Sequence, residues 1–145
     1  MPSAIGNFFI KSLINSPLHP LVGESFAVIT LTGRKTGQTI STPINIVRLG
    51  DMQTVISLRS RTWWRNLKDG RPAQLRHAGR RSKVRAEIVD APAEVTAGMA
   101  AYFSQYPGYA KYFKLRTGTD GKPDPTELEK LASERVLIRL FSIDN

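Results

Sequence analysis

Cysteine is absent from this sequence of 145 residues. Its absence excludes disulfide frameworks, thiolate nucleophiles, and cysteine-ligated zinc or iron–sulfur sites. Histidine is scarce: His19 and His77 stand alone, without the partners that a metal site needs. No serine lies in a nucleophile-elbow sequence and no pair of carboxylates stands out, so hydrolysis has little support. We expect no metal site.

Long apolar runs are also missing. The apolar run near the N-terminus is short, has no basic residues before it and contains Lys11, so neither a signal peptide nor a spanning helix is expected. Cytoplasm is the expected location. With 41% hydrophobic and 23% charged residues, the chain has an ordinary globular composition. One domain over residues 1–145 is expected, without internal repeats.

Acidic residues are few, 12 against 21 Lys and Arg, which gives a net charge of +9. Residues 59–85 contain ten basic residues and one acid, Asp69, so this stretch carries the whole surplus. Such a concentration predicts an interaction face for anions. Nucleic acid, an acidic membrane or a phosphorylated small molecule would each fit.

Apolar alternation and turn residues predict six strands, over residues 25–31, 39–49, 53–58, 73–78, 83–89 and 135–143. Because hairpin turns join most of them, an antiparallel barrel is expected, of mainly β (α+β) class. The turn of one hairpin is placed at Gly79–Arg81. Helices are expected over residues 3–15 (within a segment 1–17 that includes a linker), 62–68, 108–114, and after the caps Asp90 and Asp124; the Asp124 helix begins with a capping box.

The turn Gly33–Gln38 is the first candidate site. Its glycines allow a tight turn with exposed amides, and Arg34, Lys35 and Thr36 add charge and a hydroxyl. Such a turn can hold phosphate or carboxylate. An ordinary solvated hairpin turn fits the same spacing.

Aromatic residues form two further candidate sites. Trp63 and Trp64 point about 100° apart on a helix, so at most one is expected in the core, and the other could line a cleft or stack on a ring. Alternatively, both anchor the helix to the barrel. Tyr106, Tyr109 and Tyr112 are spaced by three and could present hydroxyl donors to a carbonyl or nitro oxygen, or simply pack on the barrel.

Four sequence blocks, in order, resemble the deazaflavin-dependent nitroreductase family of the flavin/deazaflavin oxidoreductase superfamily. They begin at Ile29 (ITLTGRKTGQ), Ser41 (STPI), Trp63 (WWRNL) and Tyr106 (YPGYAKY). The resemblance implies a split β-barrel, similar to FMN-binding and pyridoxamine-phosphate-oxidase-like proteins. It also implies hydride transfer from the deazaflavin coenzyme F-420 to a quinone, nitroaromatic or activated alkene, and a possible homodimer.

The resemblance also assigns roles to residues. The turn would meet the phosphate and oligoglutamate tail of the cofactor, and the tyrosines would cover the substrate side as catalytic residues. The cofactor-binding candidates are Gly33, Arg34, Lys35, Thr36, Gly37, Gln38, Thr42, Pro43, Ser57, Arg59, Trp63, Trp64 and Asn66; the catalytic candidates are Tyr106, Tyr109 and Tyr112.

Two departures from the family pattern keep alternatives open. The loop between Ser57 and Trp63 is shorter than in family members, and residues 116–132 form an insertion before the last strand. An FMN-binding reductase of the same fold is one alternative. Another is a non-catalytic module for nucleic acid, acidic lipid or a flavin-like ligand. Of these partners nucleic acid is the less expected, whereas peripheral membrane contact remains open.

Overall fold

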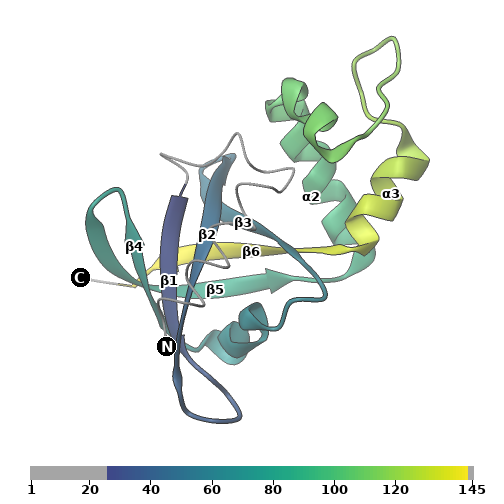
Figure 1. Ribbon diagram of the computed structural model, residues 1–145. Helices are drawn as coiled ribbons and strands as arrows, with labels where there is room; N and C mark the ends of the chain where they lie inside the picture. The colour runs from purple at the N-terminus through teal and green to yellow at the C-terminus, as the bar shows by residue number, and fades with distance from the viewer. Residues whose placement is uncertain (1–25, 144–145) are drawn as a thin grey trace.

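The computed structural model describes residues 26–143. The helix expected over residues 3–15 and His19 lie outside the described residues. Six strands close into an antiparallel barrel in the order β1-β2-β3-β6-β5-β4, and β4 pairs back onto β1 (Figure 1). The predicted six-stranded barrel is confirmed. Its strands are β1 (Phe26–Thr32), β2 (Thr39–Leu49), β3 (Met52–Leu58), β4 (Ala73–His77), β5 (Arg80–Val89) and β6 (Arg135–Ser142).

The β4–β5 hairpin has a tighter turn than the sequence indicated. Its turn residues are Ala78 and Gly79, with φ of 53° and 76°. Two successive positive φ values suit the twist of antiparallel strands, but alanine rarely adopts one, so nothing in the sequence marked this position. The expected turn at Gly79–Arg81 is therefore wrong: Arg80 and Arg81 are the first residues of β5.

Alternate residues of the strands fill the barrel, as the pleat requires. On β5 the inward residues are Val84, Ala86 and Ile88, which confirms the predicted alternation. On β2 the inward residues include Ile44 and Ile46.

A 3-10 helix, η2 (Trp63–Gly70), packs into this interior cluster. Trp63 and Trp64 are only 8% and 2% exposed. The expectation that at most one indole would be buried is wrong. A short helix wedged against the barrel is enclosed on several sides, so adjacent residues about 120° apart can both be covered.

A second apolar cluster lies outside the barrel, between the sheet and the helices α2 (Pro92–Gln105), η3 (Pro107–Phe113) and α3 (Pro125–Ser133). Val95 and Met99 of α2 are fully buried there, against Val47, Ile56 and Leu137 of the strands. Among residues 26–143, no helix is long and apolar enough to cross a membrane.

The first residues of α2 and α3 are capped differently. Asp124 accepts a hydrogen bond from the N–H of Glu127 at 3.0 Å, as predicted. The Glu127 carboxylate does not complete the capping box, because it accepts from the N–H and Nε of Arg116 instead, both at 2.7 Å. The N-cap of α2 is Ala91, which has no side-chain cap, so the prediction of Asp90 was wrong.

Candidate cofactor-binding site

The β1–β2 turn, residues 33–38, is held by hydrogen bonds of its own backbone. The N–H of Gly33 donates to the carbonyl of Gln38 at 2.8 Å, and the N–H of Gly37 donates to the carbonyl of Gly33 at 3.0 Å. Gly37 has φ of 73°, which glycine adopts without strain. The turn is therefore a defined structure held by its own backbone hydrogen bonds.

The tip of this turn faces solvent. Arg34, Lys35 and Thr36 are exposed. Within the described part of the chain, the main-chain amides of Lys35 and Thr36 have no hydrogen-bond acceptor. The tip thus offers two N–H donors beside two cationic side chains, a combination that suits phosphate or carboxylate.

The turn is docked on η2. The N–H of Arg34 donates to Oδ1 of Asn66 at 2.8 Å, and Nη1 of Arg34 donates to the carbonyl of Arg65 at 3.2 Å. Asn66 is itself oriented by a bond from Nδ2 to the carbonyl of Trp63 at 3.0 Å. Two blocks that the sequence separates by about thirty residues are thereby brought together. Arg34 uses its main-chain N–H and one side-chain donor, Nη1, in these contacts.

Both indoles are buried in the helix that supports the turn. The guanidinium of Arg65 lies 4.7 Å from the centre of the Trp64 ring, and Nζ of Lys68 lies 5.6 Å from it. Such cation–π contacts add to the packing of η2. The tryptophans therefore hold the helix that holds the turn.

The side chains of β2, the strand that follows the turn, point alternately into the barrel and outward. Thr42 points into the barrel, opposite Ile29, and is 2% exposed. Its neighbour Pro43 points outward, opposite Val28. Since side chains alternate along a strand, Ser41, Pro43 and Asn45 share this outer face. Of the two β2 candidates named from the sequence, only Pro43 lies on it.

Asn45 is a further candidate site residue, which sequence reasoning missed. It is 3% exposed, and among the described residues neither its Oδ1 nor its Nδ2 has a hydrogen-bond partner. A buried amide without partners costs free energy, which a ligand or water would remove by completing the bonding. The buried Nε1 of Trp64 and the hydroxyl of Tyr102 also lack partners among the described residues. Its signal in the sequence was a single amide within the apolar run Pro43–Val47.

Ser57 and Arg59, at the end of β3, donate hydrogen bonds to backbone carbonyls. Ser57 is buried, and its hydroxyl donates to the carbonyl of Leu58 at 3.2 Å. Arg59 donates from Nε to the carbonyl of Ser133 at 3.3 Å and from Nη2 to those of Asp90 and Arg135 at 2.7 and 3.1 Å. The guanidinium therefore joins β3 to the ends of α3 and β5.

The tyrosines lie beyond the other end of β2. The rings of Tyr106 and Tyr109 stack, with centroids 5.3 Å apart and planes 11° apart, and Tyr112 lies 5.9 Å from Tyr109. The Tyr106 hydroxyl donates to the carbonyl of Arg48 at 2.8 Å. Among residues 26–143, the hydroxyls of Tyr109 and Tyr112 have no partner. Of the three candidate tyrosines, only these two have a hydroxyl free to donate to an acceptor oxygen.

Tyr102 lies beneath this group and is 1% exposed. Burial raises the pKa of its hydroxyl, and the neighbouring Tyr109 and Tyr106 raise that pKa further. A phenol with a raised pKa stays protonated and cannot serve as a base at ordinary pH. The Tyr102 ring packs against those of Tyr106 and Tyr109, and its hydroxyl is buried without a hydrogen-bond partner among the described residues.

The turn and the tyrosines lie at opposite ends of β2 (Figure 1). At about 3.3 Å per residue, the ten residues from Gln38 to Arg48 span on the order of 30 Å if the strand is straight. Pro43 and the unpaired amide of Asn45 lie between them. A ligand that uses both predicted groups must be long, with an anionic end at the turn and another end near Arg48.

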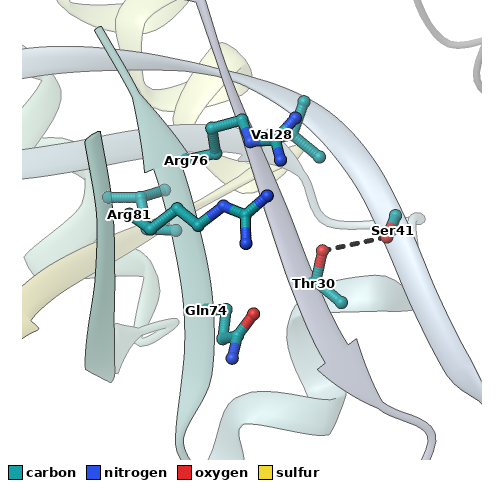
Figure 2. A pocket seen from close by; sticks show the side chains of 7 residues that line it. Val28, Thr30, Ser41, Gln74, Arg76 and Arg81 are labelled. Atoms are coloured by element: carbon teal, nitrogen blue, oxygen red, sulfur yellow. Dashed lines mark hydrogen bonds between the residues drawn. The ribbon is translucent and has the colours of Figure 1, made fainter. Parts of the chain in front are cut away.

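A pocket of about 300 Å³ lies on the outer face of β1, next to β2 (Figure 2). The hydroxyls of Thr30 and Ser41 lie 2.9 Å apart at its edge. Ser41 belongs to both the pocket and the β2 face. The residues lining the pocket are Val28, Thr30, Ser41, Gln74, Leu75, Arg76 and Arg81. Among the described residues, no three His, Asp or Glu side chains are grouped so that they could hold a metal ion.

The sequence of residues 15–121 matches the family model of the F420H(2)-dependent quinone reductase. No curated protein matches the sequence significantly.

Solved structures share the fold at low sequence identity. A conserved hypothetical protein from Mycobacterium tuberculosis is 13% identical, over 86% of this chain and 76% of its own, with a TM-score of 0.52. An FMN-binding protein from Nostoc punctiforme, related to pyridoxamine 5'-phosphate oxidase, is 10% identical over 92% and 78%, with a TM-score of 0.52. A protein of unknown function from Agrobacterium tumefaciens is 17% identical over 83% of this chain, with a TM-score of 0.51, and this chain spans 49% of its length. The predicted likeness to FMN-binding, pyridoxamine-phosphate-oxidase-like barrels is confirmed as a likeness of fold.

Proposed function

Because the chain belongs to the F420H(2)-dependent quinone reductase family, we propose that it binds a reduced deazaflavin along the outer face of β2 and reduces a small organic acceptor. A quinone is the first candidate acceptor, since the family is described by that activity. Nitroaromatics and activated alkenes are the other two classes to test. When bound, the reduced deazaflavin supplies a hydride.

The observation that carries the placement is the buried, unpaired amide of Asn45. A carboxamide offers two N–H donors and one acceptor oxygen. The pyrimidine edge of a flavin-type ring offers carbonyl oxygens and an N–H, so the two groups are complementary. A ring bound there would satisfy the amide and would lie between the turn and the tyrosines.

The turn at residues 33–38 would hold the acidic end of the same ligand. Lys35 supplies a positive charge with no structural duty, and the free amides of Lys35 and Thr36 supply directed donors. Arg34 and Asn66 orient the turn, and the buried Trp63 and Trp64 fix η2 beneath it. Phosphate and carboxylate groups are both suited to this combination.

Tyr109 or Tyr112 would donate a hydrogen bond to the acceptor oxygen as charge develops on it. Tyr106 would act by position: its hydroxyl is held by the carbonyl of Arg48, and its ring stacks on Tyr109. The helices α2 and η3, which carry these residues, would also shield the reacting atoms from water.

Asn45→Leu tests the placement. The substitution removes an amide that has no partner in the protein, so we expect the free energy of unfolding to be unchanged or higher. We expect deazaflavin affinity, followed by fluorescence titration, to fall about tenfold for the lost hydrogen bonds. Equal affinities in wild type and Asn45→Leu would reject the placement, and a saturating titration of wild type without any response would reject the function.

Lys35→Ala tests the anionic end separately. It should weaken deazaflavin binding about three- to tenfold and reduce the salt dependence, with no loss of stability because Lys35 is exposed. Lys122→Ala, in the exposed loop before α3, is the control of equal charge. Competition with FMN in the same titration decides between the two cofactors. The predicted homodimer and peripheral membrane contact remain predictions, to be checked by sedimentation and by flotation with acidic vesicles.

A further inference from the structure

The pocket beside β1 carries a concentration of positive charge on the sheet itself. Arg76 of β4 and Arg81 of β5 are directly opposite each other in the antiparallel pairing. Figure 2 shows the Arg76 guanidinium next to Val28 and the Arg81 guanidinium extending toward β1. Like charges at opposed positions of a sheet destabilise it. Solvent screens this repulsion because both side chains are exposed, and a negative group between the two arginines would turn it into attraction.

No protein group supplies that negative charge within residues 26–143. Neither Arg76 nor Arg81 has an ion pair or a hydrogen bond there. None of the residues that line the pocket is acidic. Three uncharged polar side chains also line the pocket. Gln74 has an amide, and Thr30 and Ser41 have hydroxyls that hydrogen-bond to each other at 2.9 Å.

We propose that this pocket is a binding site for a phosphate or carboxylate group, held between Arg76 and Arg81. A planar guanidinium presents paired N–H donors that match the oxygens of either group, and such charge-assisted bonds are about twice as strong as neutral ones. The hydroxyls of Thr30 and Ser41 can turn toward the anion, and Gln74 can donate its amide N–H. Val28 adds an apolar side chain to the lining.

Register places this pocket apart from the turn at residues 33–38. Thr30 pairs with Gln74 and Ser41, and Val28 pairs with Arg76 and Pro43. The pocket thus lies at the level of Ser41 and Pro43, three to five residues along β2 from Gln38, the last residue of the turn. The proposed anion site is argued from the two arginines and the pocket lining, and it does not depend on the proposed reductase activity.

Two sources could supply the anion: the acidic tail of the cofactor, or a separate phosphorylated or carboxylated molecule. Binding of inorganic phosphate and of a triglutamate peptide, measured by calorimetry on the full chain without cofactor, tests the shared chemistry. Arg76→Gln with Arg81→Gln should weaken both at least tenfold. Arg80→Gln with Arg85→Gln removes the same charge from exposed positions of β5 outside the pocket, and should weaken them less than twofold.

A second measurement needs no variant. In wild type, phosphate should shift the NMR signals of the Gln74 side-chain amide and of Nε in Arg76 and Arg81, and leave those of Arg85 in place. Equal weakening in the two double variants, or shifts spread over all surface arginines, would overturn the proposal, because either result means unspecific charge.

Two further titrations identify the source. If the anion belongs to the cofactor tail, the Arg76→Gln/Arg81→Gln variant loses affinity for the complete deazaflavin but not for deazariboflavin, which lacks phosphate and glutamate. If the anion is a separate molecule, deazaflavin affinity is unchanged and phosphate still binds to the cofactor-saturated protein. Both results support the site. A protein that binds phosphate but no deazaflavin would reject only the reductase proposal.

Discussion

The main-chain N–H of Arg34 donates to Oδ1 of Asn66 at 2.8 Å, across 32 residues of sequence. This bond fixes the turn at residues 33–38 on η2, and the tryptophans of η2 fix that helix in the barrel. The order of the turn therefore depends on a side chain that need not touch a ligand. Loss of Asn66 should affect both stability and binding.

Asn66→Ala is expected to lower the free energy of unfolding by about 1 kcal/mol, the usual net value of one hydrogen bond. It should also expose the Arg34 amide to hydrogen exchange and weaken deazaflavin binding. Asn66→Asp keeps an acceptor oxygen, so it should retain the protection of that amide. If both variants leave the Arg34 amide protected, the bond does not order the turn.

Arg59 was a predicted cofactor ligand, yet its donors are engaged by three carbonyls of the protein. Arg59→Met should lower the free energy of unfolding by about 2–3 kcal/mol, measured by urea denaturation, because bonds from a charged donor are lost and acceptors are left unpaired. Deazaflavin affinity of the folded protein should not change. Arg59→Lys keeps the charge but cannot reach all three carbonyls, so it should recover little stability. A variant of normal stability that binds cofactor poorly would restore the predicted role.

The tyrosines should separate by role. Tyr106→Phe breaks the bond to the carbonyl of Arg48 and should cost about 1 kcal/mol of stability. Tyr109→Phe and Tyr112→Phe should leave stability unchanged. One of these two should lower kcat for quinone reduction about ten- to a hundredfold at constant KM, as expected for a donor used in the transition state. Unchanged kcat in both would remove the tyrosines from the chemistry.

Glu127 should contribute to the loss of folding stability at low pH. Its pKa is lowered, first by the bond from the Arg116 N–H, then by the Arg116 side chain. Because the folded pKa lies below the unfolded one, the stabilisation is complete above the unfolded value and is lost as the pH falls through the folded value. Wild type should therefore exceed Glu127→Gln in urea midpoint at pH 7, and the gap should narrow below about pH 4. A gap independent of pH would contradict this linkage.

Much of the fold could be predicted from local pattern. The bounds of β2 were predicted to the residue, and the Asp124 cap and the inward face of β5 were predicted correctly. These features depend on alternation and on side-chain bonds to nearby backbone, both of which are local. The Ala78–Gly79 turn was missed because its alanine adopts a conformation that tertiary pairing imposes.

The candidate site was harder to predict because its residues come from distant segments. The turn and the WWRN block were both noticed, but their contact through Asn66 depends on how η2 docks. The ten basic residues of 59–85 suggested one face, whereas the fold distributes them: Arg59 bonds carbonyls, Arg65 lies over Trp64, and Arg76 and Arg81 line the pocket. Net charge alone cannot distinguish these uses.

The sequence by itself determined the barrel, the exclusion of cysteine chemistry, and the family, because alternation, composition and ordered motifs are properties of the chain. Only the tertiary structure decided that both tryptophans are buried, that Asn45 is left without a partner, and that Arg76 and Arg81 are opposed across a pocket. The physical reason is that burial and pairing are set by which strands become neighbours. Strand register brings residues such as Thr30, Ser41 and Gln74 together, and no local pattern encodes that register.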